Sequence, residues 1–167
     1  LALINIVPMF ALWASRQNPN LGIVALAADG FISGIALGPL LAVASYLAPG
    51  AIPAALAVTG GVFAVVTGFV MFSKEKFSAP AGLLTGMFFV LMIAMFVHSF
   101  IQLSGFGLII TIGIGIFGVV SLVYATSDVL NNPEYDNPVQ GALMLFAALF
   151  NIFVTALRLL LRFSSRD

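Results

Sequence analysis

Two acidic residues stand in apolar surroundings and are the first candidates for chemistry. Asp29 lies about eight residues into an apolar segment, roughly 12 Å along a helix that rises 1.5 Å per residue. Asp128 ends another apolar segment beside a polar loop. If these segments span a membrane, each carboxyl group is costly unless it is protonated, paired or hydrated, which makes both residues candidate proton- or cation-sensing groups. The alternatives are a neutral acid bonded to a neighbouring helix for Asp29 and an ordinary interfacial acid for Asp128.

A second polar feature is a stripe near the end of the chain. Asn151, Thr155, Arg158 and Arg162 follow one another at spacings that place them on one face of a helix. The two arginines could be counter-charges for the acids, which would close a buried polar network. The alternative is that they extend to the membrane surface while their stems stay in lipid.

The remaining chemistry-bearing residues exclude several function classes. His98 is the single histidine and there is no cysteine, so two-histidine and thiolate metal sites are excluded, as are disulfides and a thiol nucleophile. Helical rise places His98 roughly 13 Å deeper than Asp29, near the far end of its segment, which favours an interfacial histidine. There is no nucleophile elbow and no phosphate-binding loop. We therefore expect no enzyme activity, no metal and no cofactor.

The composition identifies the solvent of these side chains. Of the 167 residues, 62% are hydrophobic and only 7% are charged, whereas soluble domains carry roughly a quarter charged residues. Such a chain cannot cover a water-facing surface, so the lipid bilayer is its first partner. Six basic and six acidic residues leave no net charge that would attract nucleic acid.

The apolar residues form runs long enough to span a bilayer as helices. Short polar stretches separate six of them, and the longest polar loop runs from Thr126 to Pro138. Because the runs are apolar on all sides, they favour helices over barrel strands. The sequence predicts an all-α, polytopic transmembrane bundle forming a single domain over residues 1–167. The expected segments are Leu1 to Ala14, Leu21 to Leu47, Ile52 to Phe72, Ala81 to Ile101, Leu108 to Ala125 and Val139 to Leu161.

Small residues recur at helical spacing within these segments. Gly30, Gly34 and Gly38 repeat every four residues and precede Pro39, and such motifs let membrane helices approach closely. A further seam of small residues on the fifth segment leads to Asp128; it comprises Thr111, Gly115, Gly118, Ser121 and Ala125.

Several stretches resemble the Bax inhibitor family, and within it the YccA-like branch of bacterial membrane proteins. They are Gly34-Ile35-Ala36-Leu37-Gly38-Pro39-Leu40, Ala55 to Gly60, Ala125-Thr126-Ser127-Asp128, Phe150-Asn151-Ile152-Phe153-Val154-Thr155-Ala156-Leu157 and Ser165-Arg166-Asp167. The resemblance implies seven helices around a central last helix, so we expect that this chain begins within the second.

The resemblance also implies alternative functions. Some family members are proton-sensitive calcium leaks, in which two aspartates on the last two helices share a site. Asp128 matches the first, but Ala148 stands at the second position, so we consider Asp29 as a substitute acid. YccA-like members are instead linked to the membrane-embedded AAA protease FtsH.

A third hypothesis is an accessory subunit of a larger membrane complex, such as a respiratory complex. The bacterial and mitochondrial inner membranes both fit.

Overall fold

The described part of the chain folds into long helices only. The computed structural model describes Trp13 and residues 18–73, 75–78, 82–101, 105–131 and 138–165. Five helices there are long and apolar enough to cross a membrane, which confirms the predicted fold class. The first predicted segment, Leu1 to Ala14, lies outside the described residues except for Trp13, so the described spans number five rather than six. They are α2 (Pro19–Leu47), α3 (Ala51–Phe72), α4 (Leu83–Phe100), α5 (Phe106–Asn131) and α6 (Pro138–Ser164).

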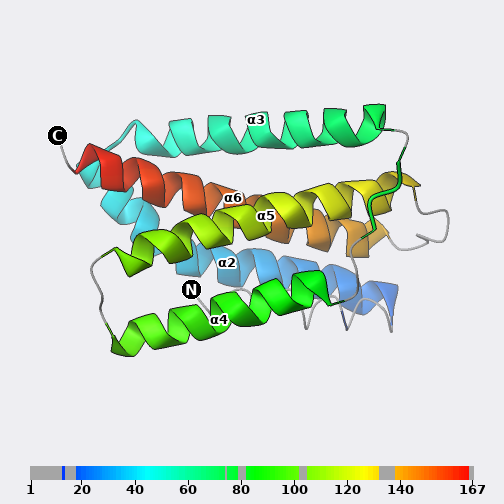
Figure 1. Cartoon of the computed structure of the whole chain (residues 1–167), viewed down its shortest axis with the longest axis horizontal. Coiled ribbons are helices and arrows are strands. Elements are labelled where there is room, and N and C mark those ends of the chain that lie inside the picture. The colour runs from blue at the N-terminus through cyan, green and yellow to red at the C-terminus, as the bar shows by residue number, and fades with distance from the viewer. Residues whose placement is uncertain are drawn as a thin grey trace.

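The helices run back and forth along one common direction (Figure 1). The start of α2, the α3–α4 connection and the end of α5 lie at one end of the bundle, which we call the acidic end because Glu75 and Asp128 are there. The short α2–α3 and α4–α5 connections and the end of α6 lie at the other, which we call the arginine end because Arg158 and Arg162 are there.

Helix α6 is the axis of the bundle. It packs against α2, α3 and α5, whereas α4 packs chiefly against α5 and has no buried residue. Both hydrophobic clusters include residues of α6: Ala148 and Ile152 join the cluster with α3 and α5, and Leu157 joins the cluster with α2 and α3. This arrangement agrees with the central last helix that the family resemblance implied.

Local chemistry explains how two helices begin and where α2 lacks one backbone donor. Asn18 caps α2, because its side-chain oxygen accepts a hydrogen bond from the amide of Asn20 at 3.2 Å and Pro19 starts the helix without needing a donor. Pro39 lies inside α2 and removes one backbone donor there. Gly105 precedes α5 with a φ of 90°, a left-handed conformation that glycine adopts without strain.

One predicted boundary is wrong. The polar stretch from Thr126 was expected to be a loop, but α5 continues for six residues beyond Ala125 to Asn131. Thr126 and Ser127 are buried there, at 5% and 1% exposure. The Ser127 hydroxyl accepts a hydrogen bond from the backbone amide of Phe77, and this tertiary contact together with the burial of both residues overrides a composition typical of turns.

Candidate functional site

The α5–α6 contact is a close helix approach at the centre of the bundle. A Cβ atom placed on Gly115 would lie 2.7 Å from the Cγ2 methyl of Thr155, and one on Gly118 would lie 3.2 Å from the Ala148 carbonyl oxygen. The Thr155 hydroxyl donates a hydrogen bond to the carbonyl of Thr111 at 3.4 Å. Gly115 and Gly118 of the predicted small-residue seam therefore allow the backbones of α5 and α6 to approach closely, as small residues do between membrane helices.

The predicted polar stripe on α6 begins in this contact and ends at the arginine end of the bundle. Asn151 and Thr155 are buried at 6% and 8% exposure, while Arg158 and Arg162 are half-buried. The stripe thus passes from the packed seam toward the membrane edge. Asn151 and Thr155 contact α5, whereas Arg158 and Arg162 lie beyond that contact.

Asp29 is the most unusual polar group in the described structure. It is fully buried, and neither of its carboxylate oxygens has a hydrogen-bond partner in the described part of the chain. Ser33, one helical turn further on, is also buried. An ionised carboxyl group is costly in such a place unless it binds a proton or a cation, and a sensing role for Asp29 stays a prediction.

Asp128 lies in the last turn of α5 within a polar cluster that the sequence did not reveal. It is half-buried and engaged with its surroundings. Beside it, the Ser127 hydroxyl accepts a hydrogen bond from the backbone amide of Phe77 at 2.9 Å, and Asn131 donates to the same oxygen at 3.4 Å. This contact ties the α3–α4 connection to the end of α5. The sequence around Ser127 and Asp128 contains no pattern that predicts a bond between Ser127 and Phe77.

The structure does not bring the two acids together directly. Asp29 is ten residues from the start of α2, roughly 15 Å inward from the acidic end, whereas Asp128 is three residues from the end of α5, roughly 5 Å inward. Their depths therefore differ by about 10 Å by helical rise. A proton could pass between them only through intervening groups or water.

The arginines are not counter-charges for either acid. Arg158 is six residues from the end of α6, roughly 9 Å inward from the arginine end, while Asp29 lies roughly 27 Å from that end. Asp128 is farther still, and Arg162 lies one turn nearer the arginine end than Arg158. The directions of the helices thus keep Arg158 and Arg162 away from Asp29 and Asp128, although their charges alone would allow ion pairs.

The predicted packing motif on α2 does not contact any described helix. A Cβ atom on Gly30, Gly34 or Gly38 would meet no atom of the described residues within 4 Å, and Pro39 is exposed. The glycines that pack closely within the described structure are on α5 instead. A role of the α2 motif in helix packing stays a prediction.

His98 lies near the end of α4, at the arginine end of the bundle. Its ring contacts Phe106 with a centroid distance of 5.8 Å, and its Nε2 would lie 3.2 Å from a Cβ on Gly107. Its Nδ1 is buried without a hydrogen-bond partner among the described residues. No three histidine or acidic side chains come together within the described ranges in a way that could hold a metal ion.

Fold and site together define a class: a polytopic helical membrane protein with ionisable groups inside the bundle. Residues 1–165 match the family model described as inhibitor of apoptosis-promoting Bax1. The chain therefore belongs to the Bax inhibitor family. No solved structure gives a significant match.

Several bacterial relatives extend the match over nearly the whole chain. The modulator of FtsH protease YccA from Escherichia coli is 31% identical over 162 residues, covering 95% of this chain and 72% of the relative. An uncharacterized protein of Pseudomonas aeruginosa is 31% identical, covering 94% and 71%, and one of Campylobacter jejuni is 32% identical, covering 95% and 69%. A second Escherichia coli relative is described as an inner membrane protein, and the bacterial inner membrane is the location that these findings support.

Ala148 stands where the resemblance implies a second acid for some family members, and this position is tightly packed in the present chain. Ala148 is fully buried in the cluster that joins α3, α5 and α6, and its carbonyl faces Gly118 across the helix contact. A carboxyl group would have to displace packed residues there. In this chain the position takes part in the contact between α5 and α6.

Proposed function

We propose that this chain is a regulatory protein of the bacterial inner membrane that modulates a membrane-embedded AAA protease of the FtsH type. The observation that carries the proposal is the similarity, along 95% of this chain, to a relative described as a modulator of FtsH protease. Family membership supports a regulatory role rather than an enzymatic one.

The geometry is compatible with a protein that acts by contact. The packed seam makes α5 and α6 a firm core, whereas α4 lies at the edge with no buried residue. Aromatic side chains stand out from α4: Phe89, Phe96 and Phe100 are 54%, 67% and 72% exposed. A partner's membrane helix could pack against this side of the bundle without disturbing the core.

Gentle solubilisation from the native membrane, followed by a native gel and mass spectrometry, tests the proposal. We expect the chain to migrate with a large complex that contains the AAA protease. Migration with a different complex, such as a respiratory complex at fixed stoichiometry, would support the accessory-subunit alternative. Migration of the chain alone would count against both.

A second candidate function is a proton-sensitive cation leak, and the burial of Asp29 favours it. A carboxyl group fully buried in a span without a hydrogen-bond partner in the described structure is the kind of group that binds a proton or a cation. The test is calcium flux into liposomes across the near-neutral pH range. Flux that keeps its pH response in both Asp29→Asn and Asp128→Asn would exclude these acids as the sensor.

A further inference from the structure

Among the residues that the structure describes, the arginine end of the bundle carries cations without acidic partners. Arg158 and Arg162 are half-buried in the last two turns of α6. The acidic residues within the described ranges all lie nearer the opposite end: Asp29 inside α2, Glu75 in the α3–α4 connection and Asp128 at the end of α5. A guanidinium at the edge of a bilayer is stable only with water or an anion, so these two groups require one from outside the described chain.

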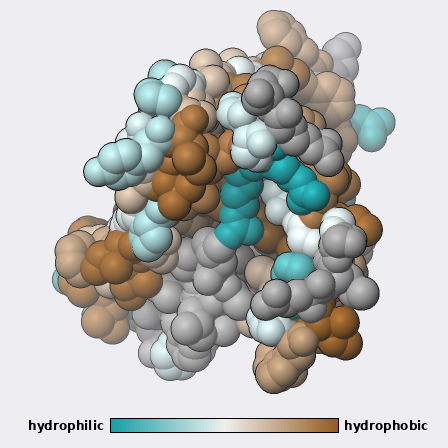
Figure 2. Space-filling model, turned by 90° about the vertical axis from the view of Figure 1, so that its left-hand side faces the viewer, coloured by the Kyte–Doolittle hydropathy of each residue, from teal (hydrophilic) through white to brown (hydrophobic). Residues whose placement is uncertain are grey.

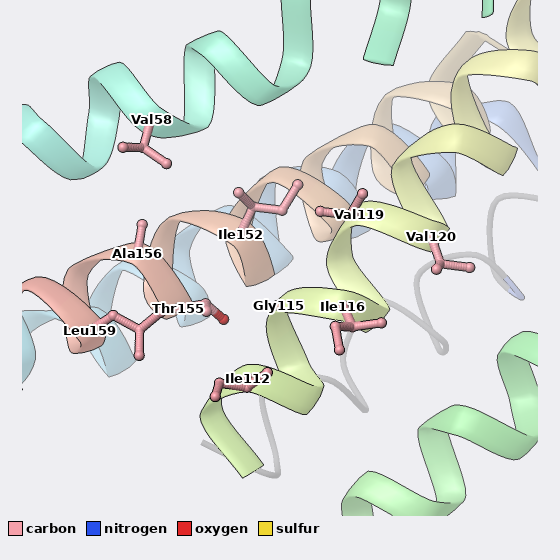
Figure 3. Close-up of a pocket in the computed structure, with 10 residues that line it drawn as sticks. All are labelled: Val58, Ile112, Gly115, Ile116, Val119, Val120, Ile152, Thr155, Ala156 and Leu159. Carbon is pink, nitrogen blue, oxygen red and sulfur yellow. The ribbon is translucent and has the colours of Figure 1, made fainter. Parts of the chain in front are cut away.

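An apolar groove runs beside the same helix. It has a volume of about 410 Å³ and lies between α3, α5 and α6 (Figure 3). Val58 of α3 forms one wall, Ile112 and Ile116 of α5 form the other, and α6 forms the floor. These three wall residues are 47%, 45% and 55% exposed, so the groove opens on the lipid-facing surface of the bundle. Thr155 is the one polar residue of its lining, and its hydroxyl is already bonded to α5.

The groove leads to the arginines. Its last lining residue on α6 is Leu159, and Arg162 follows three residues later, roughly 5 Å further along the helix. Arg162 is seven residues from the lining residue Thr155, a spacing that places both on the same face of α6, and Arg158 flanks that face. Figure 2 looks at this end of the bundle, where strongly hydrophilic surface borders a hollow.

We propose that the groove and the two arginines form a binding site for an anionic phospholipid. An acyl chain would lie in the groove between Val58 and Ile116, and the phosphate would accept hydrogen bonds from Arg158 and Arg162. A guanidinium presents a planar fork of donors that fits phosphate oxygens, and basic pockets between membrane helices bind anionic headgroups.

Two features favour a lipid over a partner helix as the occupant. Close helix contacts in membranes use small residues, whereas most residues that line the groove are branched, and only Gly115 and Ala156 among them are small. Arg158 and Arg162 at the end of the groove also need an anionic group, which an apolar helix does not provide. The site is independent of the proposed protease regulation, because it requires only the folded bundle and the bilayer.

The test measures lipid preference of the purified full chain in detergent, by native mass spectrometry with added phosphatidylglycerol or phosphatidylethanolamine. A basic residue near anionic lipid is worth about 1 kcal/mol, or roughly fivefold, so two should give roughly a thirtyfold preference for phosphatidylglycerol. We expect Arg158→Gln combined with Arg162→Gln to abolish the preference. Lys76→Gln removes one exposed cation at the acidic end and should leave it unchanged.

A second variant tests the groove without touching the charges. Val58→Phe narrows the groove from an exposed position on α3, so the fold should persist while phosphatidylglycerol binding falls severalfold. Glycerol phosphate, which lacks acyl chains, should not compete at equal concentration. Equal binding of both lipids by the unmodified chain would overturn the proposal. A second result would also overturn it: the unmodified chain self-associates, and Val58→Phe abolishes this self-association without changing the lipid preference. The groove would then bind a helix of a second copy.

Discussion

The contact between Gly115 and Thr155 allows a prediction in which two damaging substitutions repair each other. In Gly115→Ala the new Cβ would lie 2.7 Å from the Thr155 Cγ2, closer than real side chains approach. Threonine is branched at Cβ and stiff, and rotating it would break its bond to the Thr111 carbonyl. Overpacking of this kind costs about 1–3 kcal/mol, which the better helix propensity of alanine offsets by up to about 1 kcal/mol.

Thr155→Ser removes the clashing methyl and keeps the hydroxyl. Alone it should cost about 1 kcal/mol, the order expected for loss of one buried methyl group. In the double variant, the methyl group introduced at position 115 occupies the space that the threonine methyl leaves, and the next nearest atoms to the new Cβ are at 3.4 Å. We therefore expect the double variant to be close to the original in stability, with a coupling energy of about 1–3 kcal/mol.

The assay is unfolding in mixed micelles, followed by circular dichroism, for the four members of the cycle. Gly34→Ala is the matched control, because a Cβ there meets nothing within 4 Å among the described residues and should not destabilise the bundle. Additive effects of the two substitutions, with no recovery in the double variant, would show that α5 and α6 do not meet at this point.

Three further predictions concern other positions in the bundle. Gly118→Ala should lower the stability in micelles by about 1–3 kcal/mol, because a backbone carbonyl and two side chains on α6 surround the new methyl group. Gly113→Ala should cost less than half as much, because its methyl group meets only the flexible end of one leucine, and equal losses would contradict this reasoning. Ser127→Ala should cost about 1 kcal/mol and speed amide exchange at Phe77, and unchanged exchange would mean that this bond does not hold the connection. Asp29→Leu replaces a buried carboxyl group that has no hydrogen-bond partner among the described residues by an apolar group with the same branching, and it should raise the thermal midpoint; a clear fall would indicate that the carboxyl has a stabilising partner.

Composition and hydropathy were sufficient to predict the fold class. Runs of apolar residues with short polar breaks specify membrane helices, because the bilayer fixes both length and solvent. The observed α2, α3 and α6 begin and end within a few residues of the predicted segments. The end of α5 was missed because burial of Ser127 depends on a partner fifty residues away, which no local pattern encodes.

The site was predicted in part. The sequence places Asp29 deep in an apolar segment, and the structure buries it there, whereas the roles of Asp29, Asn151 and Thr155 stay predictions. Which residues meet could not be read from the sequence, since that depends on helix order and register. The glycine stripe on α2 looked as suitable for packing as Gly118, yet only the latter packs against a described helix.

The role proposed for this member of the Bax inhibitor family is regulation of a membrane AAA protease. The most direct test is the rate at which purified FtsH degrades a membrane substrate in liposomes, measured with increasing amounts of this chain. We predict that the rate changes in a saturable way and that an unrelated helical membrane protein of similar size has no effect. An unchanged rate at full incorporation of the chain would contradict the proposed role.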